Sequence, residues 1–258
     1  WPFAGALFGG QQTLSPRLQL VAAKSTANGD IPNEDSRAID LEDSNLFALN
    51  RFPGYDRFED GTRITYGVDW RWTRPGVAVT AEVGQSYRFS SRPGLIPAGT
   101  GFSGHLSDPV GRLSIRVGRF VEFTQRLRID RETLAVRRNE LDLALGSRKS
   151  FVSLGYLKFN RKIQLEDLQD HEELRAGARL AFGRYWAVFG STIVDLTSRE
   201  GVSFPPEDGF QPIRHRLGVS YTDECFEFSL GWKRNYVDNP NARQGNTFQF
   251  TLKLRNLG

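Results

Sequence analysis

An alternation of aromatic and charged residues is the feature that most limits how this chain can fold. Between Thr62 and Arg74 nearly every second residue is apolar, and the residues between them are polar or charged. A period of two is that of a β-strand, whose side chains point alternately to two faces. Charges cannot face an apolar core unless they are paired or hydrated, so the two faces meet different environments. The apolar face carries Ile64, Tyr66, Val68, Trp70 and Trp72; the polar face carries Arg63, Thr65, Gly67, Asp69 and Arg71.

The same pattern recurs along the whole chain. Tight turns alternate with long connections, so all the long loops are expected at one end of the strands. Strands of about ten residues with this asymmetry are typical of an outer-membrane barrel. We predict about twelve strands in an all-β, antiparallel transmembrane β-barrel. The strands are expected near Leu14–Ser25, Thr62–Arg74, Val77–Phe89, Gly111–Gly118, Glu122–Arg131, Leu134–Leu145, Phe151–Asn160, Glu172–Phe182, Trp186–Thr197, Pro212–Thr222, Glu224–Asn235 and Asn246–Arg255.

A soluble β-sandwich is the alternative fold. Its strands also alternate, but its polar face should point outward and its inner face would not hold this many charges. In a barrel the charged face lines a wet lumen and the apolar face meets lipid. The lumen-facing residues expected on this basis are Arg63, Asp69, Arg71, Glu82, Arg126, Arg128, Asp130, Glu140, Asp142, Arg175 and Arg179.

The composition of the chain agrees with the prediction of a β-barrel. The chain has 258 residues, a net charge of +4 and a single cysteine. No apolar run reaches the roughly 18 residues of a transmembrane helix. The sequence begins with Trp1 and shows no signal peptide, so we expect a piece of a longer protein, with residues 1–258 forming one barrel domain.

Enzymatic chemistry finds no support in the sequence. A nucleophile needs a base within hydrogen-bond reach, and none of His105, His171 and His215 has a recognisable Ser or Asp partner. One cysteine excludes a thiolate zinc site of the usual kind. The glycine-rich stretches lack a nucleotide-binding frame, and the arginines do not gather into a nucleic-acid patch. We therefore expect no catalytic residues, no cofactor, no metal and no nucleic-acid partner.

A dense loop precedes the strand described first. Its residues Asn50, Arg51, Gly54, Tyr55, Asp56 and Arg57 are expected to form a compact, self-bonded unit. Two interpretations stay open: a folded loop that caps the barrel mouth, or part of the lumenal wall that contacts a partner or a ligand.

The same stretch carries a resemblance to a known family. "DSNLFALNRFPGYDRFEDGTRITYGVDWR" resembles the LptD family of outer-membrane lipopolysaccharide-assembly proteins. The matching pattern is an Asn-Leu-Phe segment, then Asn-Arg-Phe-x-Gly-x-Asp-Arg, then a strand with Tyr-Gly. "RLRIDRETLAVRRNELDLALG", "VSLGYLKFN" and "YTDECFEFSLGWKRNY" are similar to later stretches of the family, and the likeness runs through essentially the whole chain in order.

The resemblance implies a fold, a function and partners. The chain would be the C-terminal half of a larger barrel in the Gram-negative outer membrane, without the periplasmic jellyroll and the first barrel strands. It would help to insert lipopolysaccharide into the outer leaflet through a hydrophilic lumen and a lateral gate. The implied partners are lipopolysaccharide, a plug lipoprotein of the LptE type, a periplasmic lipopolysaccharide-bridge protein and outer-membrane lipid. The surviving gate strand would carry Phe248, Phe250, Leu252 and Leu254.

Cys225 departs from the family pattern, in which two adjacent cysteines occupy this hairpin. The resemblance implies at most one inter-domain disulfide here, with its partner outside this chain; an inert thiol is the alternative. A general porin or passive outer-membrane channel remains the alternative function, because it shares every barrel feature.

Overall fold

The computed structural model describes residues 1–24, 40–89, 96, 99–160, 170–197, 209–237 and 243–254. Within these ranges the chain is all β, and its strands form one antiparallel sheet in which sequence order is also spatial order. The prediction of an all-β antiparallel fold is therefore confirmed. The strands are β1 (Phe3–Leu7), β2 (Gly10–Ala23), β3 (Gly61–Arg74), β4 (Val77–Arg88), β5 (Val110–Val117), β6 (Val121–Ile129), β7 (Val136–Gly146), β8 (Phe151–Phe159), β9 (His171–Phe182), β10 (Trp186–Asp195), β11 (Gln211–Thr222), β12 (Phe226–Asn235) and β13 (Gly245–Leu254).

The strand count exceeds the expectation by one, because β1 was not foreseen. It pairs with the start of β2 through a tight turn at Phe8 and Gly9, whose φ angles are both positive. Two positive φ angles suit the twist of a two-residue hairpin. Phe8 is an unusual residue there, so the sequence gives no standard turn signal.

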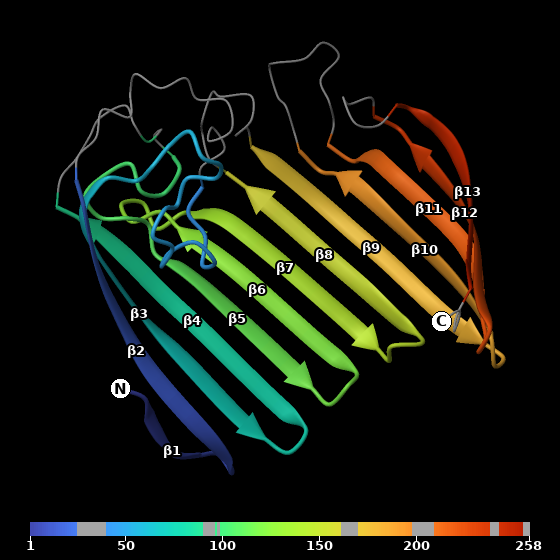
Figure 1. Cartoon of the computed structure of the whole chain (residues 1–258), viewed down its shortest axis with the longest axis horizontal. Coiled ribbons are helices and arrows are strands. Elements are labelled where there is room, and N and C mark those ends of the chain that lie inside the picture. Colours follow the sequence, from blue (N-terminus) through green and yellow to red (C-terminus); the bar gives the residue numbers. More distant parts are fainter. Residues whose placement is uncertain are drawn as a thin grey trace. The chain divides into compact units, whose positions relative to one another are not determined.

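The chain divides into two compact units. Unit 1 comprises residues 1–118, 124–140 and 158–170; unit 2 comprises residues 119–123, 141–157 and 171–258. Within each unit the short turns lie at one end of the strands (Figure 1). In unit 1 the described parts of the longer connections, residues 40–60 and 99–109, lie at the other end. Among the described residues no helix is long and apolar enough to cross a membrane.

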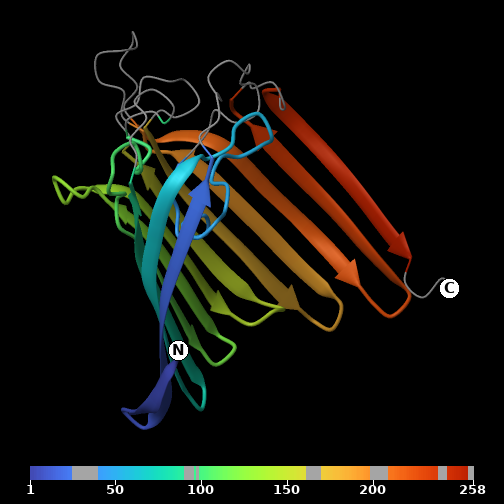
Figure 2. The same ribbon diagram turned by 60° about the vertical axis from the view of Figure 1, so that its left-hand side comes forward.

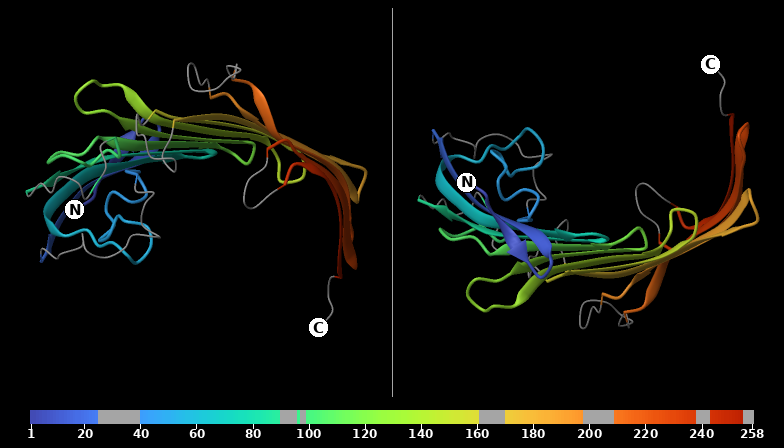
Figure 3. Two further views of the ribbon diagram at one scale, coloured as in Figure 1. Left: turned by 90° about the horizontal axis from the view of Figure 1, so that it is seen from above. Right: turned by 90° about the horizontal axis from the view of Figure 1, so that it is seen from below.

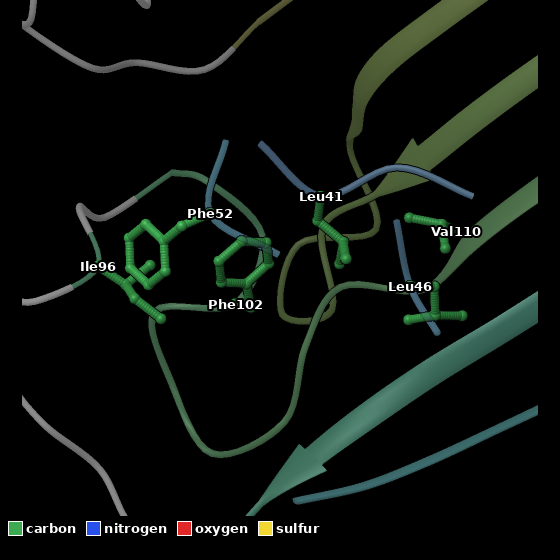
Figure 4. Close-up of a cluster of buried hydrophobic side chains, with 6 residues drawn as sticks. All are labelled: Leu41, Leu46, Phe52, Ile96, Phe102 and Val110. Carbon is green, nitrogen blue, oxygen red and sulfur yellow. The ribbon is translucent and has the colours of Figure 1, made fainter. Parts of the chain in front are cut away.

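In unit 1, residues 40–60 and 99–109 fold back onto one face of β3 and β4 (Figures 2 and 3). We call these two segments the docked loop. Together with Ile96 they supply most of the buried apolar cluster of this unit, which contains Leu41, Leu46, Phe52, Ile96, Phe102 and Val110 (Figure 4). The apolar core therefore lies under the docked loop, on the polar side of the strands.

The apolar side of the strands is the exposed one. Tyr66 on β3 is 41% exposed, whereas its neighbours Arg63 and Thr65 are 1% and 0% exposed. On β2, Leu18 and Leu20 are also exposed. A water-soluble sheet would show the reverse, so this face suits an apolar surrounding.

Candidate functional site: the buried ionic face and the docked loop

The docked loop is held to the strands first by backbone pairing. Arg88 donates its amide to the carbonyl of His105 (2.7 Å), and Ser107 donates its amide to the carbonyl of Ser86 (2.8 Å). The side chains of Thr65 and Ser86, both buried, hydrogen-bond to each other across β3 and β4. The loop thus continues the sheet alongside the end of β4 and is fixed in register.

Two glycines opposite each other let the loop approach the sheet. Gly67 on β3 pairs with Gly84 on β4. The Phe47 ring lies 3.3 Å from where a Cβ of Gly67 would stand, and a Cβ on Gly84 would meet Leu46 Cδ2 at 2.5 Å. The absence of both side chains creates the floor on which Leu46 and Phe47 pack.

Gly84→Ala should therefore weaken the docking. The new Cβ would also lie 2.9 Å from the carbonyl oxygen of Tyr66, and overpacking of this kind costs about 1–3 kcal/mol. We expect a lower denaturation midpoint and faster chymotrypsin cleavage at the fully exposed Tyr55. Gly231→Ala is the matched control, because its nearest neighbour would be 3.9 Å away; equal effects from both would contradict the role of Gly84.

Glu59 is the electrostatic centre of the docked loop. Arg51 holds both of its carboxylate oxygens, with Nε donating to Oε2 at 2.6 Å, and Arg88 holds Oε1. Arg63 Nη1 lies 3.6 Å from Oε2. Arg63 also donates from Nη2 to the carbonyls of Ala48 (2.9 Å) and Leu49 (2.7 Å). One buried carboxylate therefore gathers three arginines, one from the loop and two from the strands.

The environment of Glu59 stabilises its charged form. Burial alone would raise the pKa of Glu59. The hydrogen bond and charge of Arg51, with the charges of Arg63 and Arg88, outweigh burial and hold that pKa below the usual glutamate value. Glu59 therefore stays ionised and its arginines stay paired at neutral pH.

A second ionic cluster joins the loop to β6 and β7. Arg128 is fully buried; it binds Asp40 and donates to the carbonyls of Thr100 (2.8 Å) and Gly99 (3.0 Å). Arg138 reaches Asp40 and also binds Glu42 at 2.6 Å. Asp40 thus bridges two strands, so both ends of segment 40–60 are anchored by carboxylates.

The cluster extends along the polar face of β6 and β7. Glu140 binds both Arg138 and Arg126, with Arg126 Nη1 at 2.9 Å from Oε2. Asp108 lies 3.7 Å from Arg128 Nε. Burial raises the pKa of Asp108, although the backbone hydrogen bond from Arg131 and the charge of Arg128 oppose that rise. The arginines of this face are therefore largely neutralised within unit 1.

All the predicted lumen residues of unit 1 except Asp130 fall into three groups. Arg63, Arg126, Arg128 and Glu140 belong to the two ionic clusters. Asp69 binds Arg17 on β2 at 3.3 Å and stands opposite Glu82, which in turn stands opposite Arg112. Arg71 is exposed and lies opposite Thr80.

Asp130 lies elsewhere, just beyond the end of β6. It binds Arg137 at 2.7 Å and accepts backbone amides from Glu132 (3.0 Å) and Thr133 (2.8 Å). The Thr133 amide, followed by the Arg137 side chain, holds the pKa of Asp130 well below its usual range. Through these contacts Asp130 stabilises the connection between β6 and β7.

Unit 2 holds the remaining predicted lumen residues. Asp142 Oδ1 and Arg175 Nε lie 3.2 and 3.5 Å from where a Cβ of Gly155 would stand, so both occupy the face of that glycine. Arg175 Nε also lies 3.2 Å from Glu173 Oε1. Arg179 donates to Ser220 Oγ at 3.0 Å, between β9 and β11.

The residues predicted to form a compact loop, between 50 and 57, differ in how deeply they are buried. Asn50 donates to the carbonyl of Arg57 (3.0 Å) and accepts the amide of Glu59 (3.1 Å), so it closes the loop on itself. Arg51 is buried against Glu59. Gly54 has a positive φ of 77° and Tyr55 is fully exposed, while Asp56 and Arg57 are partly exposed at the tip.

The predicted gate strand, β13, ends the strand order and exposes its apolar face. Phe248, Phe250, Leu252 and Leu254 are 53–75% exposed. They stand opposite Trp232, Leu230, Phe228 and Phe226 of β12, and the rings of Phe228 and Phe250 touch edge to face. Cys225 is exposed with a free thiol in the β11–β12 turn, where its amide binds the Asp223 carboxylate.

The sequence alone did not identify the carboxylates that organise the site. Glu59, Asp40 and Glu42, together with Arg88 and Arg138, were not among the expected site residues. A signal existed for Glu59, which stands four residues before Arg63 in a charge-rich stretch. For Asp40 the partners lie 88 and 98 residues away, so only the fold brings them together.

The comparisons with known proteins agree with this architecture. A family model described as LPS transport system D, LptD, matches residues 1–186, which is more than half of the chain. The chain belongs to the LptD family. The resemblance seen in the sequence is thereby confirmed, and with it the class of lipopolysaccharide transport and assembly proteins.

Individual LptD relatives extend the match to nearly the whole chain. The LPS-assembly protein LptD of Nitrosococcus oceani is 24% identical over 96% of this chain and 31% of its own length. That of Alcanivorax borkumensis is 23% identical over 99% of this chain and 32% of its own length. That of an Azoarcus species is 32% identical over 46% of this chain and 14% of its own length. The chain thus spans about a third of the length of the relatives that it matches in full.

Proposed function

We propose that this chain forms part of an outer-membrane barrel that delivers lipopolysaccharide to the outer leaflet. Membership of the LptD family carries this proposal. The structure supports it through the separation of faces, with exposed apolar residues on one side of the strands and charged residues on the other. The first side suits lipid and the second suits a wet lumen.

The charged face would guide the saccharide and phosphates of lipopolysaccharide through many weak contacts. Binding that is too strong would stall passage. The ionic clusters of unit 1 fit this requirement, because Glu59, Asp40 and Glu140 already neutralise most of the arginines there. In this proposal the docked loop is a fixed part of the lumenal wall.

Sideways release of the acyl chains would use β13. An edge strand in a membrane must pair with another strand or open only transiently, since lipid cannot satisfy backbone groups. Its exposed apolar face places Phe248 and Phe250 where acyl chains would leave. The LptE-type plug lipoprotein and the periplasmic bridge protein complete the proposal as partners of the intact protein, and an inter-domain disulfide at Cys225 remains a prediction.

Photocrosslinking in living cells tests the proposed release site. With a photoreactive residue in place of Phe250, we expect an adduct with lipopolysaccharide or with the first barrel strand of the intact protein. Leu217 is the matched control, because it is 60% exposed on the same face but lies between two paired strands, β10 and β12. Lack of any adduct along β13, with ion conductance through the purified protein, would favour a passive channel instead.

A further inference from the structure

A cavity at the short-turn end of unit 2 differs from the rest of the charged face. It has a volume of about 520 Å³ and is lined by residues of three neighbouring turns and of β9, β10 and β12. Arg148 and Lys149 come from the β7–β8 turn, Arg184 from the β9–β10 turn and Arg179 from β9. Three carboxylates, Asp223, Glu224 and Glu227, line it as well.

The cations of this cavity lack the internal neutralisation seen in unit 1. Within the described parts of the chain, Arg148, Lys149 and Arg184 form no ion pair, and Arg179 binds only the neutral Ser220 hydroxyl. On the acidic side, Asp223 is already engaged, since its carboxylate accepts the amides of Cys225 (2.7 Å) and Phe226 (2.8 Å). Glu224 and Glu227 also have partners of their own. Because four cationic side chains line the cavity against three carboxylates, its lining carries a net positive charge, which favours an anionic ligand.

The backbone that carries these cations is fixed in advance. The amide of Ser147 binds the carbonyl of Ser150 (2.7 Å), and Ser150 Oγ accepts the amide of Ala181 (3.0 Å), which ties the β7–β8 turn to β9. Arg184 stacks over the Tyr185 ring, 5.2 Å from its centroid. Tyr185 in turn touches Tyr221, which also contacts Trp186.

We propose that this cavity binds a phosphate ester, held by Arg148, Lys149, Arg179 and Arg184. Arginine forms charge-assisted, often bidentate hydrogen bonds with phosphate oxygens. Four cationic side chains around one cavity, carried on turns and strands that hydrogen bonds hold in place, can supply several such bonds to one phosphate. The proposal rests on the proposed function only for the source of the phosphate. That source would be lipopolysaccharide that enters the barrel at the end where the short turns lie. An anionic phospholipid headgroup offers the same chemistry.

The test compares two double variants of the intact protein in detergent. Arg148→Gln with Arg184→Gln removes two cavity cations, and Arg74→Gln with Arg119→Gln removes two exposed cations from other short turns. The pairs are matched because all four arginines are exposed. Arg74 and Arg119 lie over the rings of Trp72 and Phe120, as Arg184 lies over that of Tyr185. Binding is followed by the fluorescence of Trp186, which lines the cavity, with Trp186→Phe identifying its signal.

The ligands are inorganic phosphate, lipopolysaccharide, the same lipopolysaccharide stripped of phosphate, and phosphatidylglycerol vesicles. We expect the cavity variant to bind the phosphorylated ligands at least about ten-fold more weakly than the wild type, because it lacks two of the cations that form charge-assisted hydrogen bonds with the phosphate. The control variant should bind like the wild type. If the cavity variant loses more affinity for lipopolysaccharide than for the vesicles, the phosphate belongs to lipopolysaccharide. If it loses more affinity for the vesicles, the phosphate belongs to phospholipid.

Equal losses in the two variants, or undiminished binding of stripped lipopolysaccharide, would overturn the phosphate site. Failure of the wider function looks different. A wild-type protein that binds phosphate but gives no lipopolysaccharide adduct at β13 would contradict the proposed function and leave the cavity intact. An adduct at β13 together with unaltered phosphate binding in the cavity variant would contradict the phosphate site and leave the proposed function standing.

Discussion

Replacing Glu59 by glutamine is expected to lower the free energy of unfolding by about 3–5 kcal/mol, because it leaves buried cations without their counter-charge. Arg51, Arg63 and Arg88 all converge on this carboxylate, and its side chain is fully buried. Chemical denaturation measures the loss, and chymotrypsin cleavage at Tyr55 reports whether the docked loop has been released. Both readouts should change together if Glu59 is what holds the loop.

Glu132→Gln is the control for this substitution. Glu132 pairs with Arg131 at 3.0 Å, but its side chain is 74% exposed. Exposed ion pairs contribute about 0–1 kcal/mol, so its loss should hardly move the denaturation midpoint. Similar shifts in the two variants would mean that the convergence of arginines on Glu59 has no energetic importance.

The pH dependence of the same variant gives an independent check. The pKa of Glu59 is lower in the folded protein than in the unfolded chain. Its contribution to stability is therefore present above the ordinary glutamate pKa and is lost as the pH falls through the folded value. The gap in stability between wild type and Glu59→Gln should narrow below about pH 4, where the unfolded carboxyl takes up its proton. A gap that widens on acidification would contradict the assignment.

Local alternation was enough to predict the strands and their two faces. The clearest example is β3, where Arg63 and Thr65 are buried while Tyr66 is exposed. A period of two needs no knowledge of distant contacts. The strand β1 could not be predicted from the sequence. Its five residues, two of them alanines, show no alternation of apolar and polar side chains, and the turn that follows has a phenylalanine at positive φ instead of a usual turn residue. Short elements without a turn signal are where sequence patterns fail.

The docked loop could be anticipated as a folded unit but not as a buried one. The self-closing contacts of Asn50 are local in sequence. The anchors that fix the loop to the strands are not, since Arg128 contacts Asp40 across 88 residues and the floor for Leu46 is a pair of glycines on β3 and β4. The charged residues alone suggested an open ionic lumen. In unit 1, however, most of these charges form ion pairs that fix the docked loop to the strands.

Leu180→Arg should impair membrane assembly, with a cost of about 2–4 kcal/mol if the residue lies near the middle of the bilayer. Leu180 is 54% exposed on the apolar face of β9 and stands opposite Val188 of β10. In the proposed barrel its side chain meets lipid tails, which cannot solvate a guanidinium. The measurement is the fraction of heat-modifiable, folded protein in outer-membrane preparations.

Arg175→Glu on the same strand provides the opposite case. Arg175 occupies the charged face near Asp142 and Glu173, and its side chain is 46% exposed. A reversed charge there meets water and two carboxylates, a repulsion of about 1 kcal/mol or less between partly exposed groups. Assembly should therefore survive this change and fail with Leu180→Arg. Equal damage at both positions would contradict the assignment of a lipid face and a lumen face on this strand, and with it the route proposed for lipopolysaccharide.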